Sequence, residues 1–411
     1  MLKIILFIFH LFTMFGFLFE IPIAGPLTTR RLSVFIALVL LYFNKESLRL
    51  ILNTVSKRRK KKALMLFFLC FLLASYHALT TGLKLVYNSY FEPWYLINIF
   101  LYVIVFSLYT VVIFKDSKAF AATYVSCFAI QTVAVYAAVI STPVRLFLYE
   151  VFYSGDDRFE RTIVHGTRIM GIALSESAGS IVCSTCVILL TYLAIRKHIG
   201  NLLYFILIAF LMSMTTFIGR TGVLVELAMA AFYVVYVQRQ KAFKILPLAL
   251  LSAFFLIYAF SALMENSDTA MSDYLIEWMT SSFTKEGRSD TLEGINQELP
   301  SFSSQFILGT GVMRGKLPNG ETILSDSGYI EICSAIGIIG GLLFYMAHWN
   351  LYRSVNFYIT ERLIRLFLYL CVLLSFVIEY KEPFMQKYIF SYILITVSLF
   401  YHKETKLGKL V

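Results

Sequence analysis

The sequence predicts an all-α integral membrane protein, and this prediction rests on the amino-acid composition. Hydrophobic residues make up 59% of the 411 residues, charged residues make up 15%, and the mean hydropathy is +0.74. A soluble domain of this length could not bury so much apolar surface, whereas roughly 20 apolar residues cross a bilayer as one helix. The strict alternation that a transmembrane barrel requires is absent, so we expect a polytopic protein with about twelve transmembrane helices.

Apolar runs place these helices in chain order. The first run follows a lysine, as in a signal peptide, but no small-residue cleavage site follows it, so we interpret it as a retained helix. The first nine helices fall within 1–264, a long outer loop with short amphipathic helices covers 265–326, and the last three helices with a cytoplasmic tail fall within 327–411. The expected spans are 4–23, 29–43, 63–84, 94–114, 119–147, 170–195, 202–219, 222–238, 244–264, 327–348, 363–380 and 385–401.

Basic residues set the orientation of the spans. The run Lys57-Arg58-Arg59-Lys60-Lys61-Lys62 is the strongest cytoplasmic signal in the chain. It places both termini in the cytoplasm and the two long loops, 148–169 and 265–326, outside. The net charge of +11 comes mostly from this bias, so we expect membrane lipid as a partner and no nucleic acid.

The second long loop has a pattern of its own. Met271, Tyr274 and Trp278 recur at helical spacing, which predicts a helix lying on the membrane surface. Loops of this length in compact proteins usually act as lids or binding loops. We therefore expect this loop to carry function.

No metal ion or other cofactor is expected. Asp156 and Asp157 are adjacent in an extended segment, so their carboxylates point to opposite sides. Cys183 and Cys186 have the spacing of a metal pair, but no second pair follows, and all six cysteines fall within predicted spans. Packing is the expected role of these cysteines, and a disulfide framework is not expected.

Arginines on the outer side oppose the usual orientation rule, so they need an explanation. Our hypothesis is that their guanidinium groups hold a phosphorylated lipid at the outer face, since arginine binds phosphate oxygens through forked hydrogen bonds. The arginines at or beyond the outer ends of the spans include Arg158, Arg161, Arg168, Arg220 and Arg288.

Two of these arginines have informative neighbours. Arg168 is followed by Gly171 and by Glu176, a carboxylate that falls several residues into an expected span. A charge at such a position needs a partner, which makes Glu176 a functional candidate or half of a structural ion pair. Arg220 sits between two glycines in Gly219-Arg220-Thr221-Gly222, where it either faces a site or extends to the interface from a hairpin.

Asp326 lies where the long loop enters the tenth span. Either Ser325 or Asp326 can cap that helix, or the Asp326 carboxylate can take a proton from an attacking hydroxyl. His165, which is close to Arg168 in the sequence, is a further candidate for a base and for substrate binding. The glycines of Gly337-Ile338-Ile339-Gly340-Gly341 have the spacing of a helix-packing motif.

The order of these motifs resembles the bacterial O-antigen polymerases, within a wider group that includes the O-antigen ligases. The resemblance covers about residues 165 to 345. The matching residues are Arg168 with Gly171 and Glu176, Gly219-Arg220-Thr221-Gly222, Arg288, Gly309-Thr310-Gly311, Ser325-Asp326-Ser327-Gly328-Tyr329-Ile330-Glu331 and Ile336-Gly337-Ile338-Ile339-Gly340-Gly341. The ligases carry a histidine near the position of Asp326, which favours polymerase over ligase.

The resemblance implies a GT-C-like, multi-pass glycosyltransferase of the bacterial inner membrane with its active site facing the periplasm. Its donor and acceptor would be glycans linked to undecaprenyl pyrophosphate, and a chain-length regulator is implied as a partner. In this scheme Arg168, Arg220 and Arg288 bind pyrophosphate. Asp326 activates the acceptor hydroxyl with Glu176 as second choice, while Tyr329 stacks on a sugar.

Two other classes of protein compete with this interpretation. A lipid-linked oligosaccharide flippase would show internal repeats and ionisable residues near the middle of the membrane, often on broken helices. We see no repeat in the sequence, and much of the non-cytoplasmic charge clusters at the outer edge. A membrane scaffold without enzymatic activity would leave the long loop and its arginines unexplained.

Overall fold

The structure, a computed structural model, is mainly helical, as the sequence predicts. It describes residues 2–24, 27–53, 55–80, 89–90, 93–153, 171–172, 176–239, 307–316, 322–323, 327–356, 359–381, 385 and 388–407. The chain forms two compact units. Unit 1 comprises Met1–Phe43, Ile113–Thr280 and Glu361–Phe367, and unit 2 comprises Asn44–Val112, Ser281–Thr360 and Leu368–Val411.

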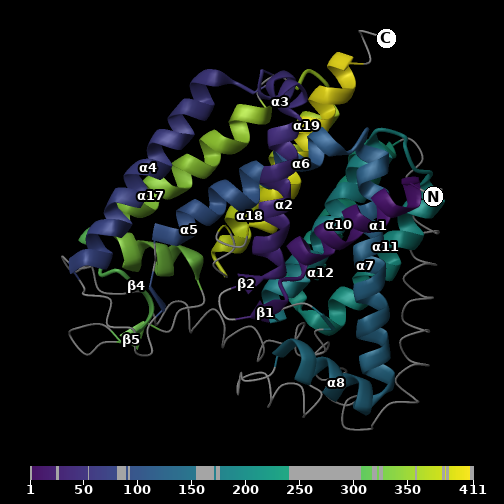
Figure 1. The fold of residues 1–411 in the computed structure, drawn as a ribbon, viewed down its shortest axis with the longest axis horizontal. Helices are drawn as coiled ribbons and strands as arrows, with labels where there is room; N and C mark the ends of the chain where they lie inside the picture. Colours follow the sequence, from purple (N-terminus) through teal and green to yellow (C-terminus); the bar gives the residue numbers. More distant parts are fainter. Residues whose placement is uncertain are drawn as a thin grey trace. The chain divides into compact units, whose positions relative to one another are not determined.

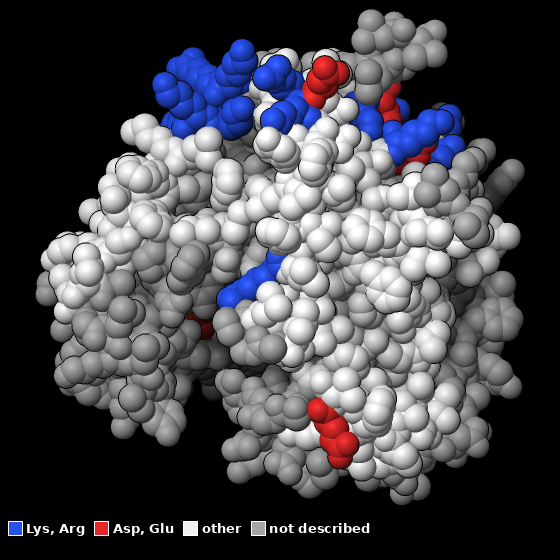
Figure 2. Space-filling view, in the orientation of Figure 1, with Lys and Arg blue, Asp and Glu red and all other residues white. Residues whose placement is uncertain are grey.

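Several helices have the length and composition of membrane spans. Within the described residues, four are long and apolar enough to cross a membrane: Leu96–Ile113, Ser117–Ile140, Asn201–Ile218 and Gly328–Asn356. Shorter apolar helices cover Ile4–Leu18, Gly179–Ile195 and Thr221–Val237. Wide areas of the described surface in Figure 2 are white, without charged side chains, as expected for helices that face lipid tails. The protein is therefore membrane-embedded, while the number of twelve spans stays a prediction, and the span 244–264 lies outside the described residues.

Unit 1 is a helical bundle with one small hairpin. Its elements are α1 (Leu2–Leu18), β1 (Pro22–Ala24), β2 (Leu27–Thr28), α2 (Thr29–Phe43), α7 (Ser117–Ile140), α8 (Thr142–Tyr153), α10 (Glu176–Ile195), α11 (Asn201–Ile218), α12 (Arg220–Phe232) and its π-helical continuation η2 (Tyr233–Val237). α1 crosses α7, and the ring of His10 packs on Phe114, just before α7, while that of Phe19 packs on Phe128. α7 and α10 run in opposite directions, with Tyr124 bonded to Thr185.

Two expected spans of unit 1 differ from the structure. The span expected over 119–147 is two helices, because α7 ends at Ile140, Ser141 is extended, and α8 contains Pro143 in its first turn. Proline has no N–H to continue the helix and its ring collides with the preceding turn, so one helix could not run through. The first helix, expected to reach residue 23, ends at Leu18, because the chain then enters the hairpin of β1 and β2.

Unit 2 combines long helices with a small antiparallel sheet, β3-β4-β5, that the sequence analysis did not anticipate. The strands are β3 (Ser89–Tyr90), β4 (Val312–Lys316) and β5 (Thr322–Ile323). The helices are α3 (Lys45–Leu52), α4 (Lys57–Thr80), α5 (Pro93–Asn98), the π-helical stretch η1 (Ile99–Val105), α6 (Phe106–Ile113), α17 (Gly328–Asn356), α18 (Arg362–Glu379, in unit 2 from Leu368) and α19 (Ile389–Leu407).

α4 and α17 lie side by side and run in opposite directions (Figure 1). At one end, Ser56 N donates to Ser354 O at 3.0 Å, and at the other a ring nitrogen of His77 lies 3.0 Å from Leu308 O. The basic run of residues 57–62 therefore occupies the end of the pair opposite to Gly309-Thr310-Gly311, and Figure 2 shows it as a blue patch over the end of α4. This separation agrees with the expectation that the two segments lie on opposite sides of a membrane.

α17 is broken at Gly337, which has φ 76° and ψ 166°. The break leaves the carbonyls of Ser334 and Ala335 without their usual helical donors. Thr310 N donates to Ser334 O at 2.8 Å and Gly311 N donates to Ala335 O at 2.8 Å. We expected the glycines of 337–341 to serve helix packing inside a span over 327–348. Gly337 instead interrupts the helix, which extends to Asn356, whereas Gly340 lies against α4, since its carbonyl accepts from Sγ of Cys70 at 3.8 Å.

Glycine is required on both sides of this contact. A Cβ on Gly309 would lie 2.4 Å from Gly337 N, and a Cβ on Gly337 would lie 2.3 Å from Ile307 O. Both residues also have positive φ, which L side chains rarely adopt. The motif Gly309-Thr310-Gly311 is therefore a backbone clasp, by which we mean residues 309–311 bonded to the broken turn of α17.

Replacing Gly337 by alanine should destabilise the protein, because the new Cβ collides with backbone and the positive φ becomes strained. We expect a loss of about 2–4 kcal/mol in the free energy of unfolding, or failure to fold. Thermal unfolding of the detergent-solubilised variant measures this. Gly200→Ala is the matched control, because no atom lies within 4 Å of its added Cβ. Equal stability of both variants would contradict the clasp.

Candidate functional site

The first residues of α10 and α12 lie at the same end of unit 1. Gly222 N, one of the free amides at the start of α12, donates to the hydroxyl of Ser180 at 3.1 Å. A Cβ on Gly222 would lie 2.1 Å from Ser180 O, so the two backbones touch. Glu176 is the first residue of α10 and Arg220 is the first of α12. Each therefore lies within about 6 Å, measured along its helix, of this contact.

The turn after Arg168 is anchored at the same end. Ile172 N donates to Oε1 of Gln131 on α7 at 2.8 Å, and Gln131 is completely buried. Gly171 has φ +56°, and a Cβ there would lie 2.8 Å from Cγ2 of Val135. Gly171 is thus fixed by its backbone conformation and by close packing, which explains why a glycine stands three residues after Arg168.

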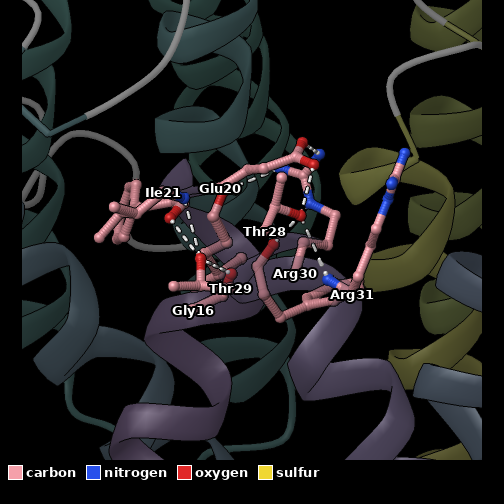
Figure 3. Close-up of polar contacts among 10 residues, drawn as sticks. Gly16, Glu20, Ile21, Thr28, Thr29, Arg30 and Arg31 are labelled. Carbon is pink, nitrogen blue, oxygen red and sulfur yellow. Dashed lines mark hydrogen bonds and ion pairs between the residues drawn. The ribbon is translucent and has the colours of Figure 1, made fainter. Parts of the chain in front are cut away.

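The hairpin between α1 and α2 adds an ion pair that the sequence analysis missed (Figure 3). Nη1 of Arg30 donates to Oε2 of Glu20, and Thr28 donates its hydroxyl hydrogen to Oε1 of Glu20 at 2.9 Å. The ring of Phe19 packs on Phe128 of α7, which lies one helical turn before Gln131, the residue that bonds to the turn 171–172. In the sequence, Glu20 and Arg30 flank a proline-containing turn, and these opposite charges could have predicted the pair.

Arg30 also holds the end of α1. Its Nε donates to Phe17 O at 2.8 Å and its Nη2 donates to Leu18 O at 3.3 Å. These carbonyls belong to the last turn of α1, where positive charge is favoured by the helix dipole. Arg30 lies on the predicted outer side, yet its position is explained by the hairpin alone. Outward arginines in this chain therefore do not all need a ligand.

A second missed residue is Glu226, inside the apolar helix α12. Glu226 has no exposed surface, and its Oε1 lies 2.8 Å from the hydroxyl oxygen of Thr215 on α11. Among the described residues, nothing hydrogen-bonds to its Oε2. Cys183 and Cys186 of α10, both free and completely buried, lie near enough to interact electrostatically with it. Glu226 is the one acidic residue in the expected span 222–238, and this position could have identified it from the sequence.

In unit 2, the described part of the Asp326 motif lies at the start of α17. The N-cap position is Ser327, whose carbonyl accepts from Glu331 N at 3.0 Å. Tyr329 donates its hydroxyl hydrogen to Phe376 O at 2.8 Å, and its half-buried ring lies 4.9 Å from that of Tyr345. The hydroxyl of Tyr345 lies 3.2 Å from Gly328 O and 3.1 Å from Oε1 of the buried Glu379.

Most of the expected site residues fall in parts of the chain that the structure does not describe. Arg158, Arg161, His165, Arg168, Arg288 and Asp326 lie outside the described residues. The helix positions of Glu176 and Arg220 are described, but their side chains are not. The grouping of Arg168, Arg220 and Arg288 around one diphosphate therefore stays a prediction, and so does Asp326 as the base.

Comparison with protein-family models, with curated proteins and with solved structures gives no match for this chain.

Ser180→Ala should destabilise the contact between α10 and α12, because it leaves the buried N–H of Gly222 without an acceptor. We expect a loss of about 1–3 kcal/mol in the free energy of unfolding, measured by thermal or denaturant unfolding in detergent. Ser184→Ala is the control, since among the described residues the Ser184 hydroxyl bonds only to Ile181 O of its own helix. A loss for Ser184→Ala as large as that for Ser180→Ala would show that the hydroxyl does not cap α12.

The Glu20–Arg30 pair should be energetically coupled. Its side chains are only 14% (Arg30) and 25% (Glu20) exposed, so Arg30→Gln should cost about 2–3 kcal/mol of folding free energy. The double variant Glu20→Gln/Arg30→Gln should cost less than the sum of the single variants. Unfolding measurements on all four proteins give the coupling energy. Strict additivity would mean that the ion pair contributes nothing to the hairpin.

Proposed function

We propose that the chain is a glycosyltransferase of the O-antigen polymerase type. It polymerises oligosaccharide repeat units carried on undecaprenyl pyrophosphate, at the periplasmic face of the bacterial inner membrane. The growing glycan moves from its lipid carrier to the next lipid-linked unit. The carrier, the acceptor and a chain-length regulator are the partners in this proposal.

One observation supports the proposal most directly. Three motif segments that are far apart in sequence come to one end of unit 1: the start of α10 with Glu176, the start of α12 with Arg220, and the turn 171–172 after Arg168. A helix start offers free amides and the positive end of the dipole, which favour an anion there. An arginine as the first residue of such a helix adds to this preference for phosphate.

The chemistry follows from the groups involved. The acceptor hydroxyl oxygen forms a bond to the anomeric carbon, and the bond from that carbon to the phosphate oxygen breaks. The electron pair leaves with undecaprenyl pyrophosphate, and the hydroxyl proton goes to Asp326 as the first choice of base, with Glu176 second and His165 third. Pyrophosphate needs charge stabilisation and no general acid, and Arg168, Arg220 and Arg288 would supply that stabilisation.

The start of α17 supports a role for unit 2. The backbone clasp at 309–311 holds the first half of α17, which begins two residues after Asp326. Tyr329 donates its hydroxyl hydrogen to Phe376 O. A contact with sugar would therefore use its half-buried ring. The clasp and this hydrogen bond would keep the acceptor-side residues in fixed positions.

A lipid-linked oligosaccharide flippase is the second candidate, and two observations favour it. Glu226 is an ionisable group buried within an apolar helix, and α17 is broken at Gly337. Both features are common in transporters. An O-antigen ligase, which transfers glycan to lipid A-core, uses the same leaving group and differs in its acceptor.

Purified protein incubated with undecaprenyl-pyrophosphate-linked repeat units should form a ladder of longer glycans. Arg220→Ala should slow this reaction by roughly a hundredfold, because a charge-stabilising donor is lost, while Arg220→Lys should retain part of the rate. Arg58→Ala, at an exposed arginine of the basic run, is the control and should polymerise normally.

The alternatives give different results in the same preparation. A wild-type protein without ladder formation that moves the lipid-linked units across vesicles would be a flippase. A product formed only when lipid A-core is supplied would indicate a ligase. Ladder formation at the normal rate by Arg220→Ala, Arg168→Ala and Arg288→Ala would remove the arginines from the mechanism.

A further inference from the structure

Glu226 lies in surroundings where a negative charge is costly. Its carboxyl group is completely buried between α10, α11 and α12. Arg220 precedes it by six residues, which places the two backbones about 9 Å apart along α12 and on different faces of the helix. Among the described neighbours, the titratable side chains near it are Cys183 and Cys186 on α10, with Cys127 on α7 next to Cys186. None of these groups carries a positive charge.

The hydrogen bonds around Thr215 indicate where the hydrogens are. The hydroxyl oxygen of Thr215 lies 2.9 Å from Leu211 O and 2.8 Å from Oε1 of Glu226. A hydroxyl has one hydrogen to donate, and Leu211 O can only accept. If Thr215 donates to Leu211 O, the short contact with Glu226 requires a hydrogen on the carboxyl group. Both contacts are then hydrogen bonds, and Oε2 becomes the carbonyl oxygen, for which a missing donor costs less than for a carboxylate.

We propose that Glu226 is a proton-binding site: a carboxylic acid that is protonated at neutral pH and donates its hydrogen to Thr215. This inference does not depend on the proposed glycosyl transfer. Release of the proton would leave a carboxylate in an apolar bundle, facing a hydroxyl that must then give up its bond to Leu211 O. Water or a cation would have to enter between the helices to stabilise that charge.

The position of Glu226 links this proton to the helix ends described above. Gly222, one turn before Glu226, touches the backbone of Ser180 on α10. Hydration around Glu226 would therefore separate α10 and α12 next to the contact that sets the starts of both helices. A bound proton keeps this contact closed, and its loss opens it.

Infrared spectroscopy of the purified protein in lipid nanodiscs tests the protonation state directly. The wild type at neutral pH should show the carbonyl band of a protonated carboxylic acid that is absent from Glu226→Gln. Glu150→Gln removes an exposed carboxylate of α8 and should keep the band. Thr215→Val should keep the band but shift it to higher frequency, because the acid then has no hydroxyl to donate to.

Two outcomes would overturn the proposal. One is a wild-type spectrum identical in this region to that of Glu226→Gln. The other is a band that Thr215→Val leaves unshifted. If Glu226→Gln does not fold, the wild-type band and its shift in Thr215→Val decide the question. Glu226→Gln should also match the unfolding temperature of the wild type within about 2–4 °C, since a neutral amide replaces a neutral acid, and a much larger loss would indicate an ionised carboxylate.

Discussion

The broken turn of α17 and the segment bonded to it form the constraint on which unit 2 depends. A membrane offers no water to a free carbonyl, so an interrupted helix is stable only if other groups bond to the exposed backbone. Here Thr310 N and Gly311 N bond to Ser334 O and Ala335 O. This contact needs glycine at 309 and 337, because any Cβ would separate the two backbones. The same contact fixes the path of the chain into β4 and the position of the start of α17.

The arginines that are predicted to lie outside the cytoplasm differ in their physical roles. Arg30 is bonded to Glu20 and to the last turn of α1, so the hairpin explains its charge without a ligand. Arg220 begins α12, where the helix dipole already favours an anion. The orientation rule alone cannot separate these cases, because it counts charges and not their partners. The proposal of a phosphate site therefore rests on Arg168, Arg220 and Arg288 and not on every outward arginine.

Among the described residues, each unit has a glutamate with no exposed surface, and both of these carboxyl groups have a hydroxyl beside them. Glu226 lies against Thr215, and Glu379 lies against Tyr345 and accepts from Met385 N at 2.7 Å. In an apolar bundle, such a pairing reduces the cost of a polar group by giving it one good hydrogen bond. The two sites differ because Glu379 uses both oxygens, whereas Oε2 of Glu226 is unbonded among the described residues. Glu226 is for this reason the more informative group for function.

The sequence by itself determined the helical membrane class, since composition and long apolar runs leave few other structures for a chain of this length. It also located α11 and most of α12 closely, because Gly219 marks the turn between two apolar runs. It identified Gly309 and Gly337 as motif residues but not their contact, and it missed Glu226 and the Glu20–Arg30 pair. Only the tertiary structure decided these features. Backbone collisions, hydrogen-bond partners and burial depend on which segments meet, and a periodic pattern along one chain does not contain that information.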